Sequence, residues 1–167
     1  MTDVPIDGEV GALGTPRHQE RLAAQRSRQR RAQGVILVAL GCGGVMGAVA
    51  RYAVSLAIPT AVNHFPWSTF IINLSGSAVL GFLLILLIEQ FPRGRLVRPL
   101  VGSGVIGAYT TFSTLEVDTL LLFRGHDIAT GVLYLTSSLL GGLVAVWLGM
   151  NAARLFIRAE EWLQGEL

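Results

Sequence analysis

The sequence predicts an all-α integral membrane protein with four transmembrane helices, the third of which is broken. Of the 167 residues, 51% are hydrophobic and only 14% are charged, whereas soluble domains carry about a quarter charged residues. Most of the 20 glycines lie inside apolar runs, where glycine lets membrane helices pack closely. These properties disfavour a soluble enzyme and a disordered chain.

Four segments are long and apolar enough to cross a bilayer, which takes about 20 residues. They are approximately residues 34–58, 67–88, 96–123 and 128–153. The second and the fourth contain no charged residue, and proline or glycine marks the short connections between the segments. We therefore expect one four-helix transmembrane domain over residues 34–158.

Both ends of the chain differ from this domain in composition. Six arginines lie within the first 31 residues, without a sustained apolar stripe. We therefore expect residues 1–33 to form a flexible, Arg-rich cytoplasmic tail, disordered or partly helical after His18, and residues 159–167 to form a short C-terminal tail. A signal peptide is the alternative at the N-terminus, but the following apolar segment is long enough to span, and no small-residue cleavage pattern is convincing.

The arginines, which make up all 13 basic residues, predict how the chain is oriented. With four spans, the side of the membrane that holds the N-terminus receives 11 arginines, and the opposite side receives only Arg124. Because basic residues mark the cytoplasmic side, we expect a multi-pass protein of the plasma membrane with both termini in the cytoplasm. An arginine cluster beside apolar spans favours the lipid bilayer, rather than nucleic acid, as its partner.

Polar side chains inside spans are costly, so they indicate where function resides. Arg51 lies inside the first span, either as a charge that attracts an anion into a vestibule or as an arginine that snorkels to the head groups. Asn73 and Ser77, four residues apart in the second span, share a helix face. Because an amide cannot face lipid unpaired, Asn73 either bonds a neighbouring helix or lines a pore. Tyr134 and Ser138 form a similar polar face in the fourth span.

The third span carries a polar run near its middle, Tyr109-Thr110-Thr111-Phe112-Ser113-Thr114, just after Gly107. Hydroxyl side chains compete with the helical hydrogen-bond ladder, so the run predicts a local break, with a continuous helix as the alternative. A break at membrane depth frees carbonyl and amide groups that bind an ion or line a cavity. Glu116 and Asp118 follow the run, but residues two apart do not share a helix face, so joint acid–base chemistry is not expected.

Three segments together resemble the CrcB/Fluc family of fluoride channels. Residues 43–52, GGVMGAVARY, resemble the first-helix pattern GGxxGAxxRY. Residues 67–82 contain the second-helix asparagine, followed by a Gly-Ser and a Gly-Phe pair. Residues 104–114, GVIGAYTTFST, resemble the third-helix signature GxxGGxTTFST. The resemblance covers about residues 35–157 and leaves the N-terminal tail outside.

The resemblance implies a passive fluoride exporter made of two antiparallel subunits, with two pores and a central structural Na⁺ ion at the dimer interface. The implied pore residues are an asparagine, a phenylalanine and hydroxyl-bearing residues: Asn73, Phe112, Ser113, Thr114, Tyr134 and Ser138. The implied sodium ligands are backbone carbonyls at Gly107 and Thr110, and Arg51 matches the first-helix arginine. Two residues depart from the family, since Leu115 stands where a second phenylalanine is usual and Asp118 where glutamate is usual.

Fluoride holds its water tightly, so a selective path needs donors at close range, such as amides, hydroxyls and the positive rim of a phenyl ring. Leu115 has no such rim, so we expect one of the two pores to be impaired or silent. The arginine bias also fixes a single orientation, whereas an antiparallel homodimer needs each chain to insert both ways. We therefore predict a heterodimer with a related subunit of opposite bias, with a homodimer as the alternative.

The alternative function is a small four-helix, proton-coupled exporter of cations or drugs. Such a transporter needs a carboxylate in the middle of a helix as proton carrier. The first two spans contain no acidic residue, and Glu116 and Asp118 lie toward one end of the third. A subunit that only scaffolds a membrane complex would leave the polar run and Asn73 without a role, so the sequence favours the channel.

Overall fold

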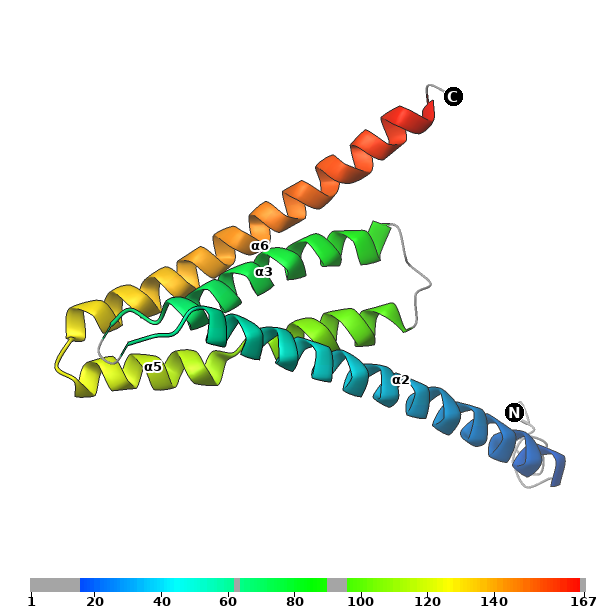
Figure 1. Ribbon diagram of the computed structural model, residues 1–167. Helices are drawn as coiled ribbons and strands as arrows, with labels where there is room; N and C mark the ends of the chain where they lie inside the picture. Colours follow the sequence, from blue (N-terminus) through cyan, green and yellow to red (C-terminus); the bar gives the residue numbers. More distant parts are fainter. Residues whose placement is uncertain (1–15, 62–63, 90–95, 166–167) are drawn as a thin grey trace, which may run out of the picture. The chain divides into compact units, whose positions relative to one another are not determined.

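The computed structural model describes residues 16–61, 64–89 and 96–165, and their regular elements are all helical (Figure 1). In chain order these are α2 (Pro16–Ala57), α3 (Trp67–Glu89), η1 (Arg98–Ile106), α4 (Gly107–Tyr109), α5 (Phe112–Arg124) and α6 (Ile128–Gly165). The chain divides into two compact units, Met1–Val38 and Ala39–Leu167.

Across the described ranges, three helices are long and apolar enough to cross a membrane. They lie in α2, α3 and α6. Only 28% of the most apolar part of α3 is buried within the chain, so most of its apolar surface is left for lipid or another subunit. The prediction of an all-α, multi-pass membrane protein is confirmed at this level.

Both predicted tails contain helical residues. Residues 16–33 belong to α2, and residues 1–15 lie outside the described part of the chain. The described arginine side chains of this tail are all exposed: Arg21, Arg26, Arg28, Arg30 and Arg31. At the other end, α6 continues past residue 158 to Gly165, and residues 166–167 are again outside the described ranges. A change from apolar to charged composition therefore does not mark the end of either helix.

In the second unit, α3 and α6 lie side by side along a seam of small residues (Figure 1). A Cβ at Gly81 would collide with the backbone carbonyl of Val146, and a Cβ at Gly149 would collide with that of Ala78. Backbone atoms cannot rotate away as the end of a side chain can, so these two positions need glycine. The reciprocal contacts keep the two helices close enough to form one wall of the site described below.

The part of α2 that belongs to the second unit packs by the same means. A Cβ at Gly43 would collide with the carbonyl of Leu100, and a Cβ at Gly47 would collide with that of Val105. Arg51 follows one turn after Gly47, and its side chain is half-buried. The first-helix glycines thus bring α2 against η1, immediately before the polar run.

Helical structure stops within the polar run. After η1, which is wound as a π-helix, and the single turn of α4, the backbone is extended at Thr110 (φ −75°, ψ 155°) and Thr111 (φ −149°, ψ 118°). Helical structure resumes at Phe112 because Thr111 caps α5, its Oγ1 accepting the amide of Thr114 at 3.2 Å. Two extended residues therefore separate α4 from α5.

The turn between α5 and α6 gives a first stability prediction. Asp127 caps α6, since its Oδ1 accepts the amide of Thr130 at 3.1 Å and its carbonyl accepts the amide of Gly131 at 3.1 Å. We expect Asp127→Ala to cost about 1 kcal/mol and to lower Tm in detergent by roughly 2–4 °C, measured by circular dichroism. Asp127→Asn keeps an accepting oxygen and should retain the wild-type Tm. An unchanged Tm in the alanine variant would contradict the assignment of this cap.

Candidate functional site

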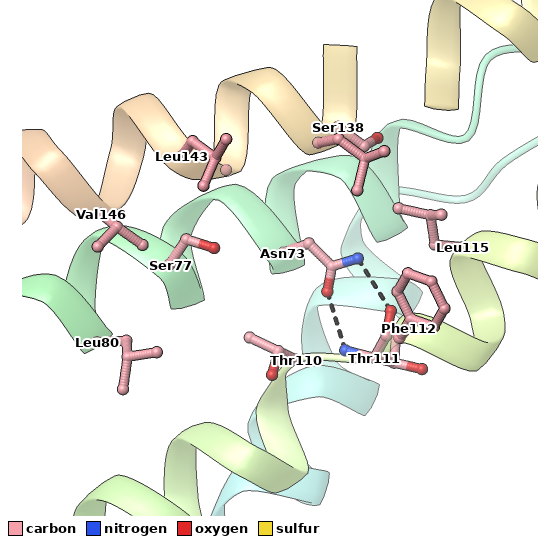
Figure 2. Close-up of a pocket in the computed structure, with 12 residues that line it drawn as sticks. Asn73, Ser77, Leu80, Thr110, Thr111, Phe112, Leu115, Ser138, Leu143 and Val146 are labelled. Carbon is pink, nitrogen blue, oxygen red and sulfur yellow. Dashed lines mark hydrogen bonds between the residues drawn. The ribbon is translucent and has the colours of Figure 1, made fainter. Parts of the chain in front are cut away.

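A pocket of about 330 Å³ lies beside the two extended residues and is lined by α3, α5 and α6 (Figure 2). Its polar lining comes from the second, third and fourth predicted spans: Asn73, Ser77, Thr110, Thr111 and Ser138. Phe112 and Leu115 border the same pocket, and the remaining lining is aliphatic or glycine. The fold thus brings together four of the sequence-predicted site residues, Asn73, Thr110, Phe112 and Ser138, with Leu115 next to them.

Asn73 is bound on both sides of its carboxamide to one residue of the extended segment. Its Nδ2 donates to the carbonyl of Thr111 at 3.0 Å, and its Oδ1 accepts the amide of Thr111 at 2.9 Å (Figure 2). In an uninterrupted α-helix the Thr111 amide would donate to the carbonyl of Gly107. That carbonyl has therefore lost its helical donor.

The carbonyl of Thr110 has lost its helical donor for a different reason. In a continuous helix the amide of Thr114 would donate to it, but that amide is bound by Thr111 Oγ1. The residues predicted to hold sodium, Gly107 and Thr110, thus both carry a carbonyl released from the ladder. Uncharged oxygens at an unwound helix suit a hard monovalent cation. Two carbonyls from one chain are fewer than the complete coordination shell of such a cation needs.

Ser138 has a buried hydroxyl that lacks a protein partner. The side chain is 8% exposed, and its Oγ has no hydrogen-bond partner within the described residues. Leaving such a group unpaired costs about 1–3 kcal/mol, so a pocket-lining hydroxyl of this kind indicates a place for a ligand or water. Phe112 differs, since it is 63% exposed at the edge of the pocket and a ring edge there is open to a small ion.

Ser113 and Thr114 are not among the residues that line this pocket. Both side chains are exposed and gather around Thr111, whose Oγ1 lies 3.3 Å from Ser113 Oγ and 2.9 Å from Thr114 Oγ1. Their hydroxyls belong to the capping cluster at the start of α5. Their assignment to the pore stays a prediction.

Tyr134 and Asp118 form a separate polar cluster one helical turn from Ser138. Asp118 Oδ2 accepts the hydroxyl of Thr69 at 2.8 Å and that of Tyr134 at 3.4 Å. Tyr134 is fully buried at 0% exposure and packs against Leu115, which is 3% exposed. The tyrosine hydroxyl is therefore directed to a carboxylate.

Aromatic rings surround this cluster on the side of Leu115. The ring of Phe65 meets those of Tyr134 and Phe70 edge to face, with centroid distances of 5.3 Å in both pairs. Leu115 packs into this group as an aliphatic member. Leu115, which stands where the family usually has phenylalanine, thus packs in the core and also borders the pocket.

Two residues of the site, Thr69 and Thr111, were not predicted, although the sequence holds a signal for each. Thr69 lies four residues before Asn73, so the polar face predicted for Asn73 and Ser77 extends to Thr69. Thr111 stands three residues before Thr114, which is the spacing of a hydroxyl cap and its bonded amide. Arg51 does not line this pocket, and its role in a vestibule stays a prediction.

Extended backbone beside a polar pocket in a multi-pass helical protein is typical of channels and transporters, because irregular backbone at membrane depth is tolerated where it lines a cavity. A family model described as "CrcB-like protein, Camphor Resistance (CrcB)" matches residues 38–150. The chain belongs to this family.

Curated relatives extend the similarity over nearly the whole chain. "Fluoride-specific ion channel FluC 1" of Streptomyces coelicolor is 42% identical over 161 residues, covering 96% of this chain and 98% of the relative. "Fluoride-specific ion channel FluC 2" of Nocardia farcinica is 39% identical, covering 71% and 85%. "Fluoride-specific ion channel FluC" of a Synechococcus strain is 40% identical, covering 71% and 92%. The resemblance stated from the sequence motifs is thereby confirmed.

Proposed function

We propose that this protein is a fluoride-selective channel subunit through which cytoplasmic fluoride leaves the cell passively, which reduces fluoride toxicity. The observation that carries the proposal is the buried Ser138 hydroxyl, which has no hydrogen-bond partner in the described part of the chain and lines the same pocket as Asn73 and Phe112. The relatives are named as fluoride-specific ion channels, which agrees with this activity. A channel moves an ion without making or breaking covalent bonds, so the protein is not an enzyme.

The chemistry of the pocket suits a small, strongly hydrated anion. Asn73 uses one N–H on Thr111, and a carboxamide has a second N–H to offer. The Ser138 hydroxyl and the rim of the Phe112 ring add two further positive groups, since the ring quadrupole is positive at its edge. Several modest sites in succession let an ion both enter and leave.

The predicted assembly is an antiparallel pair of subunits with a structural sodium ion between them. The released carbonyls of Gly107 and Thr110 support the sodium site, because two such carbonyls from each of two chains would give four ligands. When bound, sodium would supply a fixed positive charge at the interface. The exposed apolar surface of α3 supports a partner subunit within the membrane.

The orientation proposal rests on the arginines. Eleven lie on the predicted cytoplasmic side and one on the other, which supports both termini in the cytoplasm of a plasma-membrane protein. A chain held in one orientation cannot pair with an inverted copy of itself. We therefore favour a related subunit of opposite bias as the partner over a homodimer.

The proton-coupled exporter is not favoured. Its carrier would be a carboxylate inside a span, and Asp118 is bound by the hydroxyls of Thr69 and Tyr134. Glu116, two residues earlier, is exposed on α5. The relatives that cover most of this chain are named as channels.

Efflux from liposomes tests the function. The purified chain, alone and together with a CrcB-family subunit of opposite arginine bias, is reconstituted with internal fluoride or chloride, and the anions released are measured with selective electrodes. We expect the pair to release fluoride at least roughly 100-fold faster than chloride, because chloride is too large for donors placed at fluoride's distance. Equal efflux of the two anions would refute the fluoride channel. Full activity of the chain alone would refute only the heterodimer.

A further inference from the structure

We propose that Asn73 is a positioning residue, whose carboxamide holds the extended residues of the third span in place by pairing with the backbone of Thr111. The inference deepens the proposed function and rests on it for the meaning of the flux measurements described below. It assigns to Asn73 a role beyond that of a pore donor.

The two hydrogen bonds make a closed pair between side chain and backbone. The Asn73 Nδ2 to Thr111 O distance is 3.0 Å and the Thr111 N to Asn73 Oδ1 distance is 2.9 Å, both at the preferred length for N–H···O bonds. Neighbouring antiparallel strands exchange the same two bonds between opposed residues. The Asn73 side chain thus pairs with the extended backbone of Thr111 as the backbone of a neighbouring β-strand would.

The two hydrogen bonds with Asn73 explain why the helical hydrogen-bond pattern of the third predicted span stops at Thr111. A continuous helix would use the Thr111 amide for the carbonyl of Gly107, and Asn73 removes that donor from the helix. The extended backbone at Thr111 leaves its amide paired, because Asn73 Oδ1 on α3 accepts the hydrogen bond from that amide. The released Gly107 carbonyl is a direct consequence of the position of Asn73.

The surface of α3 is shaped to receive the extended segment. Gly76 follows Asn73 by three residues, and a Cβ there would collide with Thr110 Cγ2 and lie 3.1 Å from the ring of Tyr109. Ser75 Oγ lies 2.9 Å from the hydroxyl of Tyr109. Contacts at Tyr109 and Thr110, the two residues before Thr111, therefore set the segment at the distance that the short asparagine side chain spans.

The dipeptide Thr110-Thr111 is the only Thr-Thr pair in the sequence, which gives a selective probe. Protein made with carbonyl-¹³C threonine and ¹⁵N threonine yields one amide signal in a spectrum that correlates ¹⁵N with the preceding ¹³C carbonyl, and that signal belongs to Thr111. In the full-length wild type we expect its amide proton to exchange with solvent at least 10-fold more slowly than an unbonded amide. Exchange at the unbonded rate would overturn the proposal.

The two hydrogen bonds between the Asn73 carboxamide and the Thr111 backbone are called the clamp below. Variants distinguish the clamp from the role of Asn73 in lining the pocket. Asn73→Leu removes both bonds and should move the Thr111 signal, whether the amide becomes free or rejoins Gly107. Asn73→Asp keeps an acceptor for the amide and should retain its slow exchange within about 3-fold of the wild type. Ser77→Ala changes a polar residue of the same pocket that does not bond Thr111, and should leave the signal where it is.

The outcomes distinguish the two roles of Asn73. Should Asn73→Leu fail to fold, loss of the slow Thr111 exchange in a folded Asn73→Asp protein would overturn the clamp, and its retention would support it. If Asn73→Leu stops fluoride efflux but leaves the Thr111 signal unchanged, the clamp is wrong and the channel proposal stands. If the wild type carries no fluoride but the signal behaves as expected, the proposed function is wrong and the clamp stands.

Discussion

Replacing Phe112 with alanine is expected to reduce fluoride efflux by roughly 2- to 10-fold without unfolding the protein. Edge contacts between aromatic rings are worth about 0.5–1.5 kcal/mol, and loss of a rim contact of similar strength to an anion corresponds to that change in rate. The ring is 63% exposed at the edge of the pocket, so its removal costs little core packing. Efflux from liposomes measures the rate, and circular dichroism confirms the fold.

Two substitutions at the same position separate the ring from its volume. Phe112→Leu keeps a large apolar group but has no electropositive rim, so it should lose as much efflux as the alanine variant. Phe112→Tyr keeps the ring and should retain most of the efflux. Wild-type efflux in Phe112→Leu would show that bulk rather than ring electrostatics matters. Leu115→Phe, which adds a ring beside the same pocket, is expected to leave efflux unchanged or raise it.

Replacing Gly149 with alanine is expected to destabilise the protein by about 1–3 kcal/mol, the usual range for overpacking. The added Cβ would collide with the backbone carbonyl of Ala78, so α3 and α6 must separate. We expect Tm in detergent to fall by roughly 3–10 °C, measured by circular dichroism. The loss should appear whether or not a partner subunit is present, because the seam lies within one chain.

Gly142 on the same helix provides the matched control. A Cβ at that position would lie 3.6 Å from Ser77 Oγ, which is ordinary van der Waals contact. Gly142→Ala should therefore leave Tm unchanged or raise it slightly, since alanine favours helix over glycine. Equal losses in the two variants would mean that the close approach at Gly149 is not what holds α3 against α6.

The sequence predicted the helices better than their ends. Runs of apolar residues defined α3 and α6 because a span must satisfy its backbone internally and face lipid. The same runs placed the edges of the membrane domain at residues 34 and 158, and both helices continue beyond these edges, α2 from Pro16 and α6 to Gly165. Hydropathy locates the edge of the hydrocarbon layer, whereas residues such as arginine, alanine and glutamate continue a helix into water.

The site was predicted in part, and the shortfall has a physical cause. Helical spacing placed Asn73 and Ser138 on polar faces, but periodicity along one helix does not identify the atom on another helix that a side chain meets. The partner of Asn73 is a backbone amide at Thr111, and backbone groups carry no sequence signature. Ser113 and Thr114 were assigned to the pore from the family pattern, and this assignment stays a prediction, while their hydroxyls lie close to that of Thr111.

The two extended residues also separate two helical dipoles, that of the η1–α4 segment and that of α5. The carbonyl end of the η1–α4 segment carries partial negative charge, and the amide end of the 13-residue α5 carries partial positive charge. Phe112, the first residue of α5, borders the pocket, so the positive end of α5 lies at the anion path of the proposed channel. The same interruption therefore creates opposite poles from backbone dipoles alone, one suited to a cation and the other to an anion.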